Sequence, residues 1–311
     1  MLVTMQRSLI FPRPSQASSK RDHNGGALIT LDAPPDLPAD VGSTLAALHF
    51  AAPSPGAPVV VYFHGNADQV GWGGAYVGSL LRERGMGLFA IEYPGYGHAQ
   101  AGGGSPTEDS LYTAADVLLK HLVAPKSEGG LEVPAGDVVL LGQSIGGAVA
   151  LEMAARGHGA ALVLLAPFAS LPMMVDAAFP IASPALKAFP FLLLDKFDNL
   201  AKAQAGAVAS VDAAGGEGKE GRRLPVLLAH VSCPDAAEVA FFSRSQRYSY
   251  RCRQGVEDEI VPYTQGQALA SALGAELLTL EGAGHNNVLN NPHWARFANR
   301  LQGFLRECRA K

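Results

Sequence analysis

The sequence contains little that would tie the protein to a membrane, a nucleic acid or a disulfide framework. Only three of its 311 residues are cysteine, Cys233, Cys252 and Cys308, which are too few and too scattered for a zinc site or several disulfides. No apolar run reaches the length of a membrane span. A formal net charge of −4 and a pI near 6.1 argue against a nucleic acid or an anionic membrane surface as the main partner.

Targeting and nucleotide-binding motifs are also missing. The stretch 1–11 is short and contains Arg7, which makes it a poor signal peptide. We therefore expect a cytoplasmic protein, with a missing upstream anchor or targeting segment as the alternative. No G-x-x-x-x-G-K-[ST] and no H-E-x-x-H is present, and Asn287 occupies the last position of the dinucleotide fingerprint that begins at Gly282.

What the chain does contain indicates one large α/β domain. It is 48% hydrophobic and 17% charged, which suits a globular protein with a sizeable core. Apolar runs alternate with helical patterns, which predicts a mostly parallel sheet of about eight strands with helices on both faces, led by an antiparallel pair. The expected strands are 27–32, 44–50, 58–63, 87–93, 137–141, 160–166, 224–230 and 275–281. The expected helices are 67–85, 105–122, 144–157, 262–273 and 292–308.

The most informative motif is the G-x-S-x-G centred on Ser144. A buried strand precedes it, and a helical run that ends at Gly157 follows it. Strand, tight turn and helix form the context of a nucleophile elbow, in which small residues two positions away on either side let the strand and helix approach closely. We therefore predict that Ser144 is a nucleophile. The alternative is an ordinary glycine-rich turn with a capping serine, in a chain that holds 35 glycines.

A serine nucleophile needs a base, and the base needs an acid that orients it. His285 follows the last expected strand and is the predicted base, in the chain order Ser, acid, His that this arrangement requires. Asp258 is the predicted acid, since the 27 residues to His285 leave room for one helix and one strand. The less favoured carboxylates are Glu257, Glu259, Asp195 and Asp198.

The oxyanion of such a reaction needs two backbone donors. One is predicted at Ile145, directly after the nucleophile, and the other at Asn66 in the loop after the third strand. Gly65 is expected to let the backbone turn tightly there. His64 is interpreted as a structural loop histidine rather than a second base.

Together these residues resemble the α/β-hydrolase family, and within it the small-lid group of the bud-emergence type, which includes protein depalmitoylases. The matching segments are 6–12, 63–67, 93–97, 104–108, 142–147, 166–171, 196–200 and 284–287. The resemblance implies hydrolysis of an ester, thioester or related acyl bond by Ser144, Asp258 and His285, without a metal or organic cofactor. The expected partner is a small-molecule or acyl substrate, and the oligomeric state is open. Depalmitoylating members carry a cysteine-rich amino-terminal segment, which this sequence does not begin with.

Within the single domain 1–311, three segments depart from a regular strand–helix alternation. A small lid is expected at about 167–205, where an apolar stripe indicates core packing more often than an acyl site. A flexible loop is expected at about 207–222, because the segment is mostly Gly, Ala, Glu and Lys.

The third segment, 231–254, is an atypical insertion directly before the predicted acid. It holds two of the three cysteines and four arginines, and its removal would join the strand 224–230 to Gly255, three residues before Asp258. Its ends can be encoded by splice-like codons, so we hypothesise a retained intron or a gene-model error. The alternative is a true lid with the aromatic contacts Phe241, Phe242, Tyr248 and Tyr250. The insertion also motivates a competing function, that of a non-catalytic binding protein with this fold.

Overall fold

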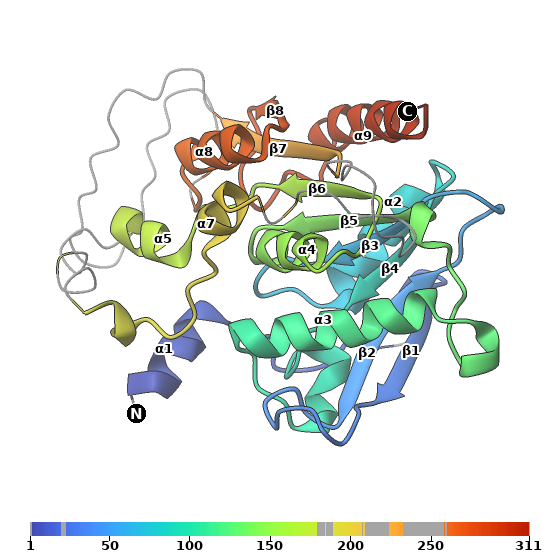
Figure 1. The fold of residues 1–311 in the computed structure, drawn as a ribbon, viewed down its shortest axis with the longest axis horizontal. Helices are drawn as coiled ribbons and strands as arrows, with labels where there is room; N and C mark the ends of the chain where they lie inside the picture. The colour runs from blue at the N-terminus through green and yellow to red at the C-terminus, as the bar shows by residue number, and fades with distance from the viewer. Residues whose placement is uncertain are drawn as a thin grey trace.

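An eight-stranded sheet runs through the centre of the molecule in the computed structural model, which describes residues 2–19, 23–178, 184, 189–206, 208, 224–232, 258 and 260–310 (Figure 1). The strands are β1 (Ala27–Asp32), β2 (Thr44–Phe50), β3 (Val59–Phe63), β4 (Gly87–Ile91), β5 (Val138–Gln143), β6 (Ala161–Leu165), β7 (Val226–Ser232) and β8 (Glu276–Glu281). Their order across the sheet is β1-β2-β4-β3-β5-β6-β7-β8. β1 and β2 are antiparallel to their neighbours, and all pairs from β4 to β8 are parallel.

The central strands are apolar throughout because helices cover both of their faces. All five residues of β3 are buried, and they alternate between two hydrophobic cores. Val59, Val61 and Phe63 point into one core, while Val60 and Tyr62 point into the other. Continuous apolar runs without a period of two are therefore what this sheet requires.

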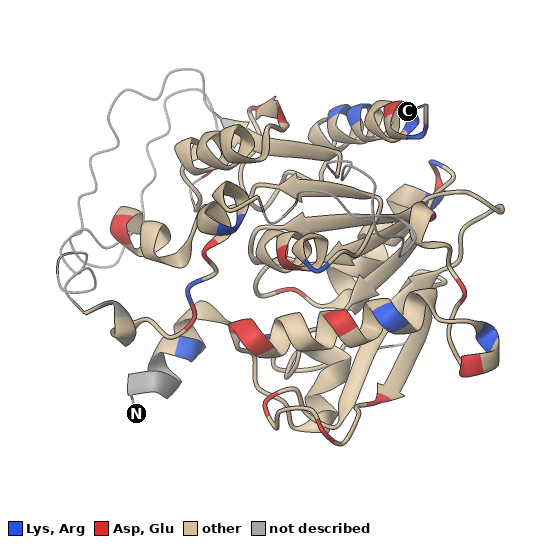
Figure 2. Ribbon diagram, viewed as in Figure 1, with Lys and Arg blue, Asp and Glu red and all other residues tan. Residues whose placement is uncertain are grey.

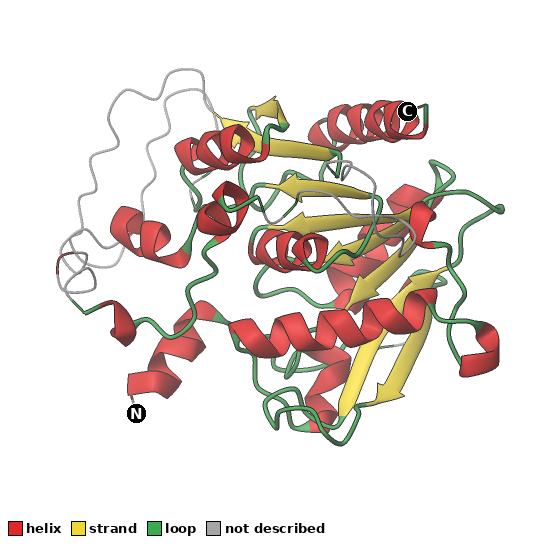
Figure 3. Ribbon diagram, viewed as in Figure 1, coloured by secondary structure: helices red, strands yellow, loops and turns green. Residues whose placement is uncertain are grey.

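Helices pack on each face of the sheet (Figure 3). One core contains buried residues of α3 (Glu108–Val123), α4 (Ile145–Ala155) and α8 (Tyr263–Leu273). The other contains buried residues of α2 (Ala75–Arg82), which continues the π-helical turn η2 (Val70–Gly74), and of α9 (His293–Arg309). Short 3₁₀ turns complete the main body at η3 (Gly97–Gly102), η4 (Lys126–Glu128) and η5 (Ala135–Asp137).

Four elements lie beside this main body and were not predicted individually: α1 (Leu2–Ile10), α5 (Leu171–Ala178), η6 (Pro190–Leu192) and α7 (Asn199–Gln204). Gln6 joins α1 to the predicted lid, because its side chain donates to the carbonyl of Leu192 at 2.8 Å and accepts from the N–H of Leu194 at 3.1 Å. The apolar stripe of this region is only partly core. Met174 packs against the core, whereas Phe191 is 69% exposed.

The sequence-based fold class is correct, and the observed strand bounds differ from the predicted ones by a few residues. The first two residues of the segment 231–254 belong to β7, where Val231 is buried and pairs with Leu280 of β8. The predicted start of the insertion therefore lies within a strand. Residues 233–254 lie outside the described part of the chain. The predicted flexible loop does too, apart from Val208, which is buried.

Charged side chains are distributed unevenly over the longest described helices. α3 carries Glu108, Asp109 and Asp116 against Lys120, whereas α9 carries four arginines against Glu307 (Figure 2). Of the helices that the structure describes, none is both long and apolar enough to cross a membrane.

Candidate active site

Ser144 lies on a strained turn between a strand and a helix. β5 ends at Gln143 and α4 begins at Ile145, so Ser144 alone makes the connection. Its backbone angles are φ 53° and ψ −119°, which a residue other than glycine adopts only under constraint. The Ser144 N–H donates to the carbonyl of Leu165 on β6 at 2.9 Å, so the neighbouring strand holds the turn in place. This strand–turn–helix arrangement is the context that the motif requires.

Close backbone approach explains the glycines on both sides of Ser144. A Cβ on Gly146 would lie 2.1 Å from the carbonyl oxygen of Phe63, and one on Gly142 would lie 2.2 Å from the carbonyl oxygen of Gly146. These contacts involve backbone atoms that cannot move aside, so only glycine fits at either position. The start of α4 is therefore pressed against the end of β3, whose following loop carries Asn66.

His285 and Asp258 form a hydrogen-bonded pair. Nδ1 of His285 lies 2.8 Å from Oδ2 of Asp258, and the two side chains are only 5% and 1% exposed. An ionised carboxylate can only accept, so Nδ1 carries the ring hydrogen and Nε2 is the unprotonated nitrogen of the neutral ring. This tautomer is the one that a histidine base must have to take a proton from a serine.

Backbone donors fix the other oxygen of Asp258. Oδ1 accepts from the N–H of Val261 at 2.7 Å and from the N–H of Ile260 at 3.0 Å. Val261 is itself buried in the core, two residues before α8 begins. The carboxylate is therefore held from its C-terminal side, with Oδ2 directed at His285.

The loop that carries His285 closes on itself directly after β8. The side-chain oxygen of Asn287 accepts from the N–H of Gly284 at 2.8 Å, and the N–H of Asn287 donates to the carbonyl of Gly284 at 3.3 Å. β5 and β8 run parallel within one sheet, so Ser144 and His285 both follow the carboxyl ends of their strands. That edge is where open α/β sheets bind their ligands.

The predicted oxyanion loop follows β3 and is tied down through the side chain of Asn66. The amide nitrogen of that side chain donates to the carbonyl of Ile10, and Oδ1 accepts from the hydroxyl of Tyr96 at 2.8 Å and from the N–H of Ala67 at 3.2 Å. Because the side chain is committed to these contacts, the backbone N–H of Asn66 is the group to consider as a donor to substrate. Ile145 supplies the second predicted donor as the first residue of α4, where helix N–H groups lack intrahelical partners.

The tight turn of this loop has a different origin from the expected one. Gly65 does not adopt a left-handed conformation, and a Cβ there would meet Gln143 no closer than 3.8 Å. Ala67 adopts it instead, with φ 58°. The expectation for Gly65 was therefore wrong, and an alanine gives no sequence signal for such a conformation.

The less favoured carboxylates serve other purposes where the structure describes them. Asp195 accepts from a backbone N–H at the start of α3 and pairs with Arg7 at 3.3 Å. Asp198 caps the first turn of α7. Glu257 and Glu259 lie outside the described residues.

A second histidine lies behind the acid and was not predicted as part of the site. His230 on β7 is fully buried, and its Nδ1 donates to the carbonyl of Val231 at 3.0 Å and lies 4.0 Å from Oδ2 of Asp258. Burial lowers the pKa of His230, so it remains neutral beside the carboxylate. No three His, Cys, Asp or Glu side chains within the described ranges are placed so that they could hold a metal ion.

The chain is similar to known proteins in both sequence and fold. The sequence matches the family model described as the alpha/beta hydrolase family over residues 59–300, which is well over half of the chain. The chain belongs to the alpha/beta hydrolase family. This membership confirms the fold class and the family resemblance drawn from the motifs.

Two curated relatives and two solved structures illustrate how far the similarity extends. Human alpha/beta hydrolase domain-containing protein 17B is 28% identical over 259 residues, which cover 82% of this chain and 69% of the relative. Protein bem46 of Schizosaccharomyces pombe is 30% identical over 151 residues, which cover 47% of this chain and 46% of the relative. The esterase Pf2001 of Pyrococcus furiosus superposes with a TM-score of 0.59 at 15% identity, covering 96% of this chain and 98% of that one. The butyrate-bound esterase Est2 of Thermogutta terrifontis gives 0.57 at 15% identity, covering 92% and 95%.

Two further polar contacts beside the site of this alpha/beta hydrolase were not predicted. The hydroxyl of Tyr62 donates to Oε1 of Gln143 at 2.7 Å, directly before the nucleophile. Glu92 pairs with His64 at 3.2 Å beneath the predicted oxyanion loop. Tyr62 lies within an apolar run and is indistinguishable from core. Glu92 carried a usable signal, because an acidic residue directly after a buried strand demands a partner.

Proposed function

We propose that this protein is a serine hydrolase that cleaves an ester, thioester or related acyl bond through an acyl-enzyme. The observation that carries the proposal is the hydrogen bond between buried Asp258 and His285. It orients the imidazole at the sheet edge where Ser144 occupies its strained turn. A lone serine at a tight turn would have no need of that pair.

In the first half of the proposed reaction, Oγ of Ser144 attacks the acyl carbon while its proton passes to Nε2 of His285. Asp258 stabilises the imidazolium that forms. The N–H groups of Asn66 and Ile145 receive the oxyanion of the tetrahedral intermediate. Collapse of the intermediate breaks the bond to the alkoxide or thiolate, which takes the proton from Nε2 and leaves as an alcohol or thiol.

In the second half, water attacks the acyl carbon bound to Ser144. His285 takes a proton from the water and returns it to Oγ of Ser144 when the carboxylic acid is released. The same two donors serve the second oxyanion. The balance is one acyl bond and one water consumed, with one acid and one alcohol or thiol formed, and none of these steps requires a cofactor.

The competing function, a non-catalytic binding protein, was motivated by the segment that precedes the acid. If that segment prevented catalysis, the acid would be displaced from the base. The 2.8 Å contact between Asp258 and His285 favours the hydrolase.

A fluorophosphonate probe tests the proposal without knowledge of the substrate. Wild-type protein should be labelled at Ser144, and Ser144→Ala should abolish labelling while leaving the melting temperature unchanged. Hydrolysis of a responsive ester should fall by about 10⁴–10⁶, because triad members act as a unit. Ser54→Ala is the matched control, since Ser54 is exposed in the loop between β2 and β3. Full labelling of Ser144→Ala would refute the assignment.

The substrate class can then be sorted with a panel of p-nitrophenyl esters, acyl thioesters and anilides. Short acyl chains are the first to test, because one of the similar solved esterases is described as butyrate-bound. Hydrolysis of anilides alone would exclude the ester and thioester assignment.

A further inference from the structure

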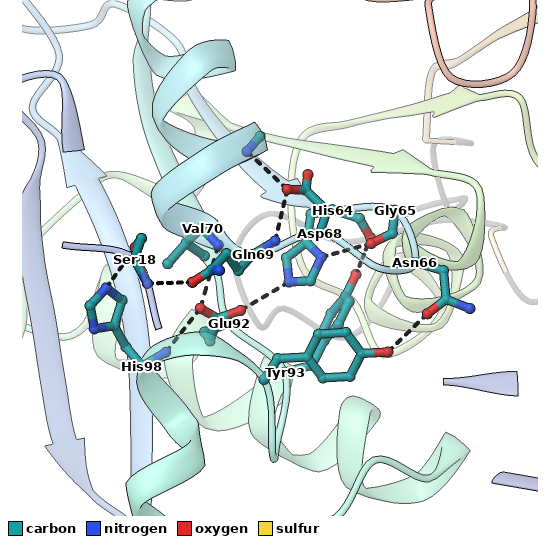
Figure 4. A network of polar contacts seen from close by, with 12 residues as sticks. Ser18, His64, Gly65, Asn66, Asp68, Gln69, Val70, Glu92, Tyr93 and His98 are labelled. Atoms are coloured by element: carbon teal, nitrogen blue, oxygen red, sulfur yellow. Dashed lines mark hydrogen bonds and ion pairs between the residues drawn. The ribbon is translucent and has the colours of Figure 1, made fainter. Parts of the chain in front are cut away.

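A buried ion pair lies directly behind the predicted oxyanion loop (Figure 4). Nε2 of His64 is 3.2 Å from Oε1 of Glu92, and neither side chain has any exposed surface. Nδ1 of His64 lies 2.9 Å from the carbonyl oxygen of Gly65. Both ring nitrogens face acceptors, so both must carry hydrogen, and the ring is an imidazolium paired with a carboxylate. Burial lowers the pKa of His64, but the hydrogen bond to Glu92 and its charge outweigh burial and raise the pKa.

Glu92 also connects the loop to two neighbouring segments (Figure 4). Its second oxygen, Oε2, lies 3.2 Å from the N–H of His98 in η3 and 3.4 Å from the N–H of Val70 at the start of η2. A Cβ on Gly97 would lie 2.1 Å from the same oxygen, so the chain passes the carboxylate too closely for any side chain. One carboxylate thus connects three segments beside the site, two through backbone N–H groups and one through the side chain of His64.

Two tyrosines from the segment after β4 donate hydrogen bonds to the same loop. The hydroxyl of Tyr93 donates to the carbonyl of His64 at 2.7 Å, and the centres of the two rings are 4.1 Å apart. The hydroxyl of Tyr96 donates to the side-chain oxygen of Asn66 at 2.8 Å. Both tyrosine rings are almost fully buried. The loop is therefore fastened at His64 and again at Asn66, the residue that carries the proposed oxyanion donor.

From this geometry we propose that Glu92 and Tyr96 are positioning residues that aim the Asn66 N–H at the oxyanion formed when Ser144 attacks. The proposal rests on the proposed function. A donor stabilises a developing charge only if it is already fixed in place, because reorientation during the reaction would cost the energy it supplies. A buried ion pair contributes little net stability compared with well-packed apolar residues. Stability alone therefore gives no reason for a charged pair at this position.

The test compares two conservative changes of buried tyrosines, Tyr96→Phe and the control Tyr112→Phe. Tyr112 lies on α3, where its hydroxyl contacts Glu108 at 3.0 Å and Lys202 at 2.9 Å and no part of the loop. The reaction followed is phosphonylation of Ser144 by the fluorophosphonate probe, because its rate reports on oxyanion stabilisation without a known substrate. Each variant gives two quantities, the maximal labelling rate and the probe concentration for half-maximal rate.

Removal of a whole oxyanion donor costs about 10²–10³ in rate, so loosening one donor should cost about tenfold in the maximal labelling rate of Tyr96→Phe. The half-maximal concentration should stay within about twofold, since initial binding does not use the oxyanion donors. Tyr112→Phe should label at the wild-type rate. A wild-type rate for Tyr96→Phe, an equal loss in Tyr112→Phe, or a change confined to the half-maximal concentration would each overturn the positioning role.

Glu92→Gln provides the second variant. The introduced amide has one oxygen in place of two. If that oxygen accepts from His64, its NH₂ group faces the N–H donors of His98 and Val70, which then lack an acceptor. We expect a loss in maximal rate of about 10², larger than that of Tyr96→Phe. If this variant does not fold, Tyr96→Phe still decides. Wild-type protein that the probe does not label refutes the proposed function and this inference together, whereas labelled wild type beside an unchanged Tyr96→Phe refutes the positioning role alone.

Discussion

Replacing Asp258 by asparagine tests the proposed acid through a single hydrogen bond. Oδ1 of Asp258 accepts from two backbone N–H groups, those of Ile260 and Val261, and Oδ2 faces Nδ1 of His285. The introduced amide must therefore place its oxygen on the two N–H groups and its NH₂ on the histidine. That arrangement makes Nδ1 an acceptor and puts the ring hydrogen on Nε2, which can no longer take the proton of Ser144.

The expected loss of activity depends on the cost of the other orientation of the introduced amide. Turning the amide oxygen toward His285 would leave both N–H groups facing an NH₂ group. The N–H of Ile260 is open to solvent, so the main cost is that of the part-buried N–H of Val261, about 1–3 kcal/mol. At about 1.4 kcal/mol per factor of ten, the unproductive tautomer is favoured by about 5-fold to about 150-fold. Loss of the carboxylate charge opposite the imidazolium adds to this. We expect kcat to fall by about 10⁴, a size typical of Asp-to-Asn changes in Ser-His-Asp triads.

The assay is hydrolysis of a responsive ester with the melting temperature measured in parallel. Asp198→Asn is the matched control, because Asp198 caps α7 and asparagine caps a helix equally well. Its kcat and melting temperature should both remain at wild-type values. If Asp258→Asn keeps more than about a tenth of the wild-type kcat while folded, the tautomer reasoning is wrong and another residue orients His285.

Two further predictions concern the buried ion pair and the glycines around the site. The raised pKa of His64 means that the stabilisation from its pair with Glu92 is complete below the unfolded histidine pKa of about 6.5 and is lost as pH rises through the folded value. The difference in free energy of unfolding between wild type and Glu92→Gln, from urea titrations, should therefore shrink as the pH is raised above the unfolded value of about 6.5, and a constant difference would contradict the charged pair. Gly146→Ala should destabilise the fold by about 3 kcal/mol, because its methyl group meets fixed backbone. Gly65→Ala and the control Gly136→Ala should unfold within about 0.5 kcal/mol of wild type, since neither Cβ is obstructed, and equal losses in all three would refute this steric account.

The fold was predictable because its strands are long apolar runs separated by helical patterns. The run that became β3 is buried along its whole length, so its hydrophobicity is unambiguous. The lid region was less predictable. α1, η6 and α7 are short and are held by side-chain contacts such as those of Gln6 with the segment after η6, and such contacts leave no periodic pattern in the sequence.

The candidate site also contains residues that the sequence predicted and residues that it did not. The glycines beside Ser144 have steric reasons, and motif pattern and chain order were enough to nominate Ser144 and His285 as candidates. The place of Glu92 directly after a buried strand signals that it has a partner, but only the folded chain shows that the partner is His64. His230 contacts its neighbours only in the folded chain. Ala67 shows the limit of residue-type arguments, since its left-handed conformation is imposed by the loop rather than favoured by the residue.

The anchoring of Asp258 explains how a long segment can precede the acid without displacing it. Ser232 ends β7 and is paired with Glu281 of β8, and 25 residues (258 − 232 − 1) separate it from Asp258. The carboxylate is held by backbone N–H groups that follow it, next to buried Val261 and the start of α8. Its position therefore depends on the helix after it rather than on the strand before it. Each doubling of the connecting length costs only about 0.6 kcal/mol in loop entropy, so the length of that connection places little demand on the acid–base pair.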